Sequence, residues 1–284
     1  MTGTQRSGTT WLGTILSCGS SVGYIHEPFN TVNVAIHDSP ISIPYQYINK
    51  ESNKRSSAAF RRYLEYFVDP GLRFFYNSIF PIKSIDSRYL MPGYQLILNG
   101  VQNDIQIIKD PFALLSAEWL HTSLNWDIVI TIRHPAAFAL SMKEKNWIVT
   151  PTVFEQQAKA MSHLYADHES LIQTYLDKND KRPDLIGSAI LGWKLLHIAI
   201  KYYQEKYPNW CYIRHEDLSI DPTGQFGSLF NRLDLEYNLK VKSKIEATSQ
   251  GVLTRGRYRD SNLNVKKWKQ RLQVNEIDRI KSET

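Results

Sequence analysis

A glycine-rich segment close to the amino terminus, residues 3–10, has the composition of a loop that binds an anion. It reads Gly-Thr-Gln-Arg-Ser-Gly-Thr-Thr, and its glycines have the G-x-x-x-x-G spacing of a phosphate-binding loop. Small residues let backbone N–H groups converge on an anion, and a following helix adds unpaired N–H groups and its positive dipole end. The segment therefore predicts a phosphate site; the alternative is a Gly-Ser-Thr turn that caps a helix.

The positive charge of this loop differs in position from that of a nucleoside triphosphate site. Loops that bind triphosphates continue after the second glycine with Lys and then Ser or Thr. Here Thr9 and Thr10 follow Gly8, and the cation is Arg6, which precedes the second glycine. The arrangement favours a ligand with one 5′-phosphate and a nearby anionic group, and it argues against a P-loop kinase.

A second candidate for anion binding follows the apolar segment 126–132 (WDIVITI). Arg133 comes directly after this predicted strand and can form a forked, charge-assisted contact with a phosphate. Ser141 lies two turns into the helix predicted at 135–145, from where its hydroxyl can reach the same phosphate. The alternatives are a surface arginine beside a helix and a serine tolerated within it.

Residues suited to proton transfer and charge stabilisation follow two other predicted strands. Glu27 and His26 come after a short strand at 23–25, and Lys109 ends a second apolar strand. A carboxylate partly buried in a cleft is expected to have a raised pKa, which suits a general base. A lysine that leaves a buried strand needs a partner, so the alternative for Lys109 is an ion pair with Asp110 or another neighbour.

These residues require a framework that brings the ends of several strands together. Apolar runs predict strands, and helical spacing predicts helices, in alternation along the chain: strands at 23–25, 105–109, 126–132 and 209–213, and helices at 9–18, 112–124, 135–145 and 186–206. This alternation predicts an α/β fold with a parallel sheet covered by helices on both faces. Ligands of such sheets bind at the carboxyl ends of the strands.

The segment from about 30 to 103 interrupts the alternation. It is rich in Pro, Tyr and Phe, and within it we predict one helix, at 54–68. We interpret it as a partly helical cap that binds the acceptor substrate, inserted into a single domain spanning residues 1–284. Because only Met1 and Thr2 precede the first glycine, we expect the first strand to be very short.

The composition limits the classes of function. The net charge of +6 suits an anionic ligand, but the basic residues are dispersed outside 255–271, so no nucleic-acid partner is predicted. No Cys-x-x-Cys pair occurs, and Cys18 and Cys211 are expected to be buried free thiols, which fits a cytoplasmic protein. No metal-ligand cluster and no apolar run of membrane-spanning length are predicted.

Together these motifs resemble those of sulfotransferases that use 3′-phosphoadenosine 5′-phosphosulfate (PAPS). The segment TQRSGTTWL, residues 4–12, resembles the family's 5′-phosphosulfate loop, and Arg133 with Ser141 resembles its 3′-phosphate motif. Residues 24–30 (YIHEPFN) resemble a turn of bacterial and carbohydrate-type members. Residues 211–222 (CYIRHEDLSIDP) resemble a further family segment, whose acidic residues are expected to cap and brace the fold.

The resemblance implies a fold and a donor site. The fold is a three-layer α/β/α domain like that of P-loop NTPases, and the chain would move the sulfuryl group of PAPS to an acceptor hydroxyl without a metal. The product would be adenosine 3′,5′-bisphosphate. The residues implied in donor binding are Arg6, Ser7, Gly8, Thr9, Thr10 and Trp11 at the 5′ end, Arg133 and Ser141 at the 3′-phosphate, and Arg255, Arg257 and Arg259 in a late basic segment.

The resemblance also implies roles in the reaction. Glu27 would be the general base, with His26 as the second choice and Asp110 still possible, while Lys109 and Arg6 would stabilise the transferring and leaving groups. The acceptor would be a glycan or a similar hydroxyl compound, and the aromatic cap would also suit a lipid or a phenol. The alternatives are a P-loop-type kinase and a non-catalytic module that binds an anionic ligand.

Overall fold

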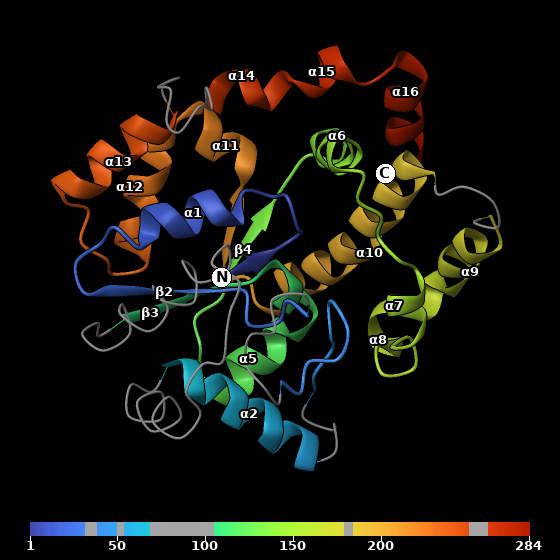
Figure 1. Ribbon diagram of the computed structural model, residues 1–284, viewed down its shortest axis with the longest axis horizontal. Helices are drawn as coiled ribbons and strands as arrows, with labels where there is room; N and C mark the ends of the chain where they lie inside the picture. Colours follow the sequence, from blue (N-terminus) through green and yellow to red (C-terminus); the bar gives the residue numbers. More distant parts are fainter. Residues whose placement is uncertain (32–38, 50–53, 69–104, 179–183, 250–260) are drawn as a thin grey trace, which may run out of the picture.

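The computed structural model describes residues 1–31, 39–49, 54–68, 105–178, 184–249 and 261–284 (Figure 1). Most of the predicted cap lies outside the described residues, and so do Arg255, Arg257 and Arg259. The helix predicted in the cap is present as α2, which spans Lys54–Val68. The predictions for the late basic segment stay predictions.

Five parallel strands form the centre of the described structure: β1 (Thr2–Gly3), β2 (Val22–His26), β3 (Ile105–Lys109), β4 (Val129–Ile132) and β5 (Cys211–Arg214). They pair as β1-β4-β5 and as β2-β3. Met1 joins the two groups, because its nitrogen donates to the Ile108 carbonyl at 2.7 Å and its carbonyl accepts from Asp110 N at 3.0 Å. This bonding pattern is that of neighbouring parallel strands, so the spatial order is β2-β3-β1-β4-β5.

Side chains of the strands alternate between two hydrophobic clusters, one on each face of the sheet. On β4 and just before it, Ile128 and Ile130 pack into one cluster, and Val129 packs into the other. On β5, Cys211 and Tyr212 divide in the same way. The period of two along a strand explains this division. The predicted three-layer α/β/α fold with a central parallel sheet is confirmed.

The helices that cover the two faces come from different parts of the chain (Figure 1). One face packs against α1 (Thr9–Leu16), α11 (His215–Ile220), α12 (Pro222–Arg232) and α13 (Leu239–Ser249). The other packs against η1 (Pro111–Ser116), α5 (Ala117–Leu124), α6 (Pro135–Lys145) and α10 (Leu185–Lys206). The remaining elements are α7 (Thr152–Glu155), α8 (Ser162–Tyr165), η2 (Ala166–His168), α9 (Glu169–Lys178), α14 (Ser261–Lys266), α15 (Trp268–Arg271) and α16 (Val274–Glu283).

Helix α10 differs from the expectation that no apolar run reaches membrane-spanning length. By length and composition it is long and apolar enough to cross a bilayer, and 61% of its most apolar window is buried inside the protein. It packs closely against α6 and contacts α8, α9 and α16 as well. In this fold it serves as a core helix.

Several predicted boundaries shift for local reasons. The strand predicted at 126–132 begins at Val129, and the helix predicted at 112–124 begins as the 3-10 turn η1. Asp110 caps that turn, because its carboxylate accepts from Phe112 N at 2.9 Å, and Pro111 occupies the first position. The first strand is as short as expected, with two residues in β1.

The packing of α10 predicts that two leucine-to-alanine substitutions differ strongly in their effect on the free energy of unfolding. Leu196 of α10 has no exposed surface, so Leu196→Ala is expected to lower the free energy of unfolding by about 2–5 kcal/mol. Leu239 is 79% exposed, so Leu239→Ala should stay within about 0.5 kcal/mol of wild type. Urea denaturation of both variants measures the difference. Equal effects would contradict the placement of α10 in the core.

Candidate active site

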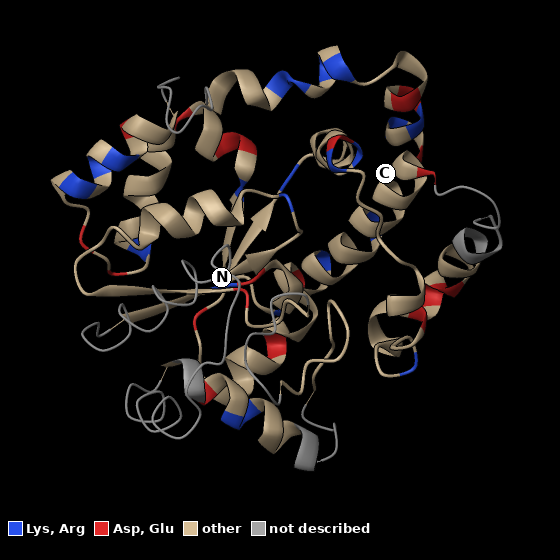
Figure 2. Cartoon of the chain, in the orientation of Figure 1, with Lys and Arg blue, Asp and Glu red and all other residues tan. Residues whose placement is uncertain are grey.

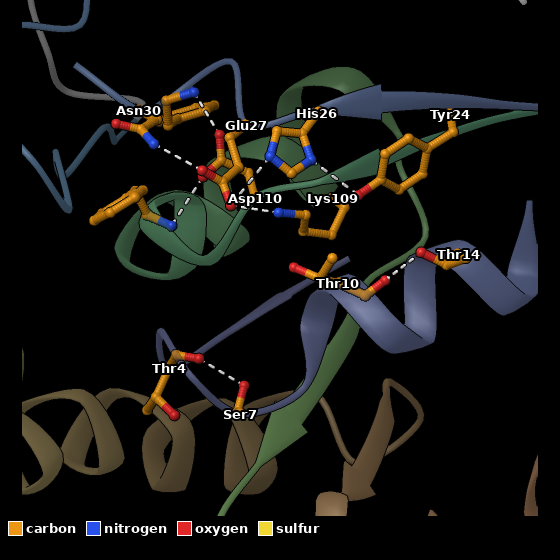
Figure 3. A network of polar contacts seen from close by, with 12 residues as sticks. Thr4, Ser7, Thr10, Thr14, Tyr24, His26, Glu27, Asn30, Lys109 and Asp110 are labelled. Atoms are coloured by element: carbon orange, nitrogen blue, oxygen red, sulfur yellow. Dashed lines mark hydrogen bonds and ion pairs between the residues drawn. The ribbon is translucent and has the colours of Figure 1, made fainter. Parts of the chain in front are cut away.

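The loop between β1 and α1 is held in shape by its own contacts. Ser7 is buried, and its hydroxyl donates to the Thr4 carbonyl at 2.6 Å (Figure 3). The same hydroxyl pairs with the Thr131 hydroxyl of β4. Gly8 caps α1 with φ of 89°, and a Cβ there would lie 2.3 Å from Nδ1 of His215. Glycine is therefore required at this position both by its backbone conformation and by the close approach of His215.

A cavity of about 360 Å³ opens beside this loop, at the carboxyl ends of the strands. Its lining includes residues that follow every strand of the sheet: Gln5 after β1, Glu27 after β2, Pro111 after β3, Arg133 after β4 and His215 after β5. This is the position expected for a ligand of a parallel α/β sheet. The predicted site residues that line it are Arg6, Gly8, Thr9, Thr10, Trp11, Glu27, Arg133 and Ser141.

Two arginines meet at one end of the cavity. Arg133 donates from Nη1 to the backbone carbonyl of Arg6, and Arg6 donates from Nε to the Ser141 hydroxyl at 2.9 Å. The Trp193 indole also donates to the Arg133 carbonyl at 2.9 Å. Burial lowers the pKa of Arg133 to about 10, with Glu216 opposing and Arg6 adding to the effect. The guanidinium of Arg133 therefore remains charged at neutral pH and presents a cation to the cavity.

The segment from Arg133 into α6 is braced by residues from the carboxyl-terminal part. The backbone N–H of His134 donates to the buried carboxylate of Glu216 at 3.0 Å, and the His134 ring stacks on Trp268 at 4.9 Å between centroids. Glu216 therefore has the structural role expected for it. Figure 2 shows basic residues between β4 and α6 and along α14 and α15.

Glu27 lies at the other end of the cavity, directly after β2. Its φ of 50° is in the left-handed region, and its backbone N–H still bonds to the Lys109 carbonyl at 2.8 Å. Both of its carboxylate oxygens have donors: Lys109 Nζ binds Oε1, and Asn30 Nδ2 donates to Oε2 at 2.7 Å (Figure 3). A strained backbone that holds a fully bonded carboxylate is a common feature of functional sites.

The ion pair with Lys109 corrects one prediction about Glu27. Burial acts to raise the pKa of Glu27, but the charge and hydrogen bond of Lys109 and the hydrogen bond of Asn30 outweigh it, so the pKa lies below its ordinary value. The raised pKa expected from the sequence is therefore wrong. Lys109 is itself fully buried and does not line the cavity; burial lowers its pKa, while Glu27 opposes the shift.

The other two candidates for the base do not line the cavity. His26 pairs through Nδ1 with the Tyr24 hydroxyl at 3.0 Å, and its Nε2 lies 3.7 Å from Glu27 Oε1. Burial lowers the pKa of His26, and Lys109 adds to this, with Glu27 opposing. Asp110 is fully buried and accepts hydrogen bonds from the backbone of Phe29 and Phe112. Of the predicted bases, Glu27 alone faces the cavity of the described structure.

Comparison with known proteins bears on the fold. No family model matches the chain, and no curated protein matches it. A solved structure, the sulfotransferase domain from the curacin biosynthetic pathway, is similar over 99% of this chain and 94% of its own, with a TM-score of 0.50 and 15% identity. The chain has a sulfotransferase fold. That fold is P-loop-like, as the resemblance to PAPS-dependent sulfotransferases implies.

Some residues of this sulfotransferase-fold cavity were not predicted from the sequence. Asn30 is the last residue of the His-Glu-Pro-Phe-Asn motif, in which only the glutamate and the histidine were assigned roles. Its place in this motif could have predicted that it lines the cavity. Others come from segments without a chemical motif and include Trp147, Thr248, Asn264 and Lys267. His215 lies within residues 211–222, a segment that resembles one of the family, in which a role was expected only for the acidic residues. Among the described residues, no three His, Cys, Asp or Glu side chains gather as a metal site.

The pKa of Asp110 in the folded state predicts how the free energy of unfolding changes with pH. Burial raises its pKa from 3.8 to about 7, with backbone hydrogen bonds opposing. The folded state then binds the proton more tightly, so stability is highest below the unfolded pKa and falls as pH rises toward 7. A shift of this size corresponds to about 4 kcal/mol.

We expect Asp110→Asn to remove this loss, so that the variant gains stability relative to wild type between about pH 4 and pH 7. Urea denaturation at a series of pH values measures the gain. Asp217→Asn, at a side chain that is 44% exposed, is the matched control and should follow wild type. A constant difference between Asp110→Asn and wild type across this range would contradict the assignment.

Proposed function

We propose that the protein is a sulfotransferase that moves the sulfuryl group of PAPS to an acceptor hydroxyl. The observation that carries the proposal is one cavity with a phosphate-type loop in its wall, arginines at one end and an ionised carboxylate at the other. The sulfotransferase fold supports this assignment. The cavity wall thus contains candidate partners for the two anionic ends of the donor and a candidate base.

The donor would bind along the loop. Backbone N–H groups at the start of α1, around Gly8 and Thr10, would hold the 5′-phosphosulfate with the help of the helix dipole. Arg133 and Ser141 would hold the 3′-phosphate, which ATP lacks. The cavity volume, about 360 Å³, is within the range of small-molecule sites.

Glu27 would accept the proton of the acceptor hydroxyl. The hydroxyl oxygen would then bond to sulfur while the bond from sulfur to the 5′-phosphate oxygen breaks, and that oxygen keeps the electron pair. The products are a sulfate ester and adenosine 3′,5′-bisphosphate. Because Lys109 keeps Glu27 ionised, the carboxylate is ready to accept a proton at neutral pH.

Several parts of this proposal come from sequence resemblance. Residues 26–30 support a glycan or a similar hydroxyl compound as acceptor, and the free thiols of Cys18 and Cys211 fit the proposed cytoplasmic location. The proposed role of Lys109 in stabilising the leaving group requires its amine to exchange Glu27 for the donor. In the present arrangement, Lys109 acts on Glu27.

Nucleotide selectivity tests the donor assignment. By calorimetry we expect adenosine 3′,5′-bisphosphate to bind more tightly than AMP or ATP, because Arg133 and Ser141 contact the 3′-phosphate. Arg133→Ala should weaken bisphosphate binding by about 10- to 100-fold, as expected for a charge-assisted hydrogen bond. Preference for ATP would favour a kinase. Absence of nucleotide binding would favour a module for another anionic ligand and contradict the proposal.

Measurements of turnover test whether Glu27 is the general base. With labelled PAPS and a panel of glycans and phenols, Glu27→Gln should lower kcat by about 100-fold or more, since it removes the proton acceptor. Binding of adenosine 3′,5′-bisphosphate should remain close to wild type. Glu118→Gln is the matched control, because Glu118 also pairs with a lysine, Lys206 at 2.7 Å, but lies outside the cavity. Retained turnover in Glu27→Gln would reject Glu27 as the base.

A further inference from the structure

The turn that follows β2 brings the side chain of Asn30 back onto the carboxylate of Glu27. The backbone N–H of Asn30 donates to the Glu27 carbonyl at 3.1 Å, which closes the turn. The side-chain amide of Asn30 then donates from Nδ2 to Glu27 Oε2 at 2.7 Å (Figure 3). Both residues line the cavity, so this contact lies at the end of the cavity that holds the proposed base.

Contacts with two other elements hold the main chain of this turn. Phe29 is buried in the hydrophobic core, and its backbone N–H donates to the carboxylate of Asp110, which follows β3. The Pro28 carbonyl accepts a hydrogen bond from the Tyr63 hydroxyl of α2 at 2.8 Å. Because the main chain is anchored to both the sheet and α2, the side chain of Asn30 extends from a fixed position.

The two oxygens of the Glu27 carboxylate have different surroundings. Oε1 binds the amine of Lys109, which is fully buried and does not line the cavity. Oε2 accepts from Asn30, which does line it. The terminal torsion of a glutamate has broad preferences, so a hydrogen bond to each oxygen is needed to fix the carboxylate plane. An ionised carboxylate has about four acceptor positions, so these two bonds leave capacity for a further donor.

We propose that Asn30 is a positioning residue of the reaction, and that it directs Oε2 of Glu27 toward the acceptor hydroxyl as the atom that takes the proton. This inference rests on the proposed function. It implies that the loss of the Asn30 amide misplaces the base and leaves the nucleotide-binding part of the cavity unchanged.

The hydrogen bond from Asn30 also stabilises the ionised form of Glu27 and so contributes to its lowered pKa. Substitution of Asn30 leaves in place the titratable groups that face Glu27 from the sheet and from the segments packed against it: Lys109, Asp110, His26, Tyr24 and Tyr45. Asn30→Ala should therefore raise the pKa of Glu27. Since the base acts in its ionised form, the fall of kcat/KM on the acid side of the pH profile should move to higher pH.

Two measurements on Asn30→Ala test the inference. Carbon-13 NMR of protein labelled at the glutamate side-chain carboxyl measures the pKa of Glu27, whose signal is identified by its loss in Glu27→Gln; this pKa should rise. Turnover of labelled PAPS with the panel of glycans and phenols should show kcat lower by about 10-fold even where Glu27 is fully ionised, because the base is misplaced. Binding of adenosine 3′,5′-bisphosphate should stay at the wild-type level.

Asn231→Ala is the matched control, at an exposed asparagine of α12 outside the cavity, and should match wild type in all three measurements. If Asn30→Ala does not fold, as judged by its thermal unfolding, Asn30→Asp replaces it. Aspartate keeps the size of the side chain, removes the donor and adds a like charge, so the pKa of Glu27 should rise further.

Each other outcome has a distinct meaning. An unchanged pKa of Glu27 in Asn30→Ala would overturn the inference, and this measurement requires no acceptor. A raised pKa with wild-type kcat and an unmoved pH profile would also overturn it, while the turnover of PAPS by wild type would leave the proposed function intact. Failure of wild type to bind adenosine 3′,5′-bisphosphate would overturn the proposed function and the inference together.

Discussion

The site depends on the hydrogen bonds that a very short strand makes on both of its sides. Glu27 follows β2, Lys109 is the last residue of β3, and Arg133 follows β4. In the described structure β1, with Met1 before it, lies between these two pairs of strands and bonds to both. The register of Thr2 opposite Ile130 therefore determines how far the carboxylate end of the cavity lies from the arginine end. The loop that continues from β1 forms the wall between them.

The charges of the cavity are arranged so that each is held by a fixed partner. Lys109 keeps Glu27 ionised and is itself fully buried. Removing the partner of a buried lysine leaves an uncompensated charge in the interior, which is strongly destabilising. At the other end, Arg133 is anchored through a carbonyl and not through an acid, so its charge remains available to a ligand. An ionised carboxylate at one end of the cavity and arginine side chains at the other would suit the proposed transfer between an anionic donor and a neutral hydroxyl.

Local patterns in the sequence were sufficient for the fold and for part of the cavity wall. The glycine spacing, the apolar runs and the polar residue after each run identified the loop, the strands and the strand-end residues, because these features depend on neighbours in sequence. The predicted rise in the pKa of Glu27 was wrong because Lys109, the partner that lowers this pKa, is 82 residues away in sequence. Thr248 reaches the cavity by tertiary packing alone, and no local pattern distinguishes it from a surface residue.

The position of the loop cation determines which neighbouring element its side chain can reach. In a triphosphate loop the lysine follows the second glycine, at the start of the helix, and projects along the chain of phosphates. Here the cation precedes the second glycine, on a residue with left-handed backbone, and its side chain leaves the loop sideways toward α6. A shift of a few residues in sequence thus moves the charge from the phosphate chain to a neighbouring helix. In this fold, that helix carries the hydroxyl of Ser141, which accepts a hydrogen bond from Arg6, so the loop and the helix contribute to the same end of the cavity.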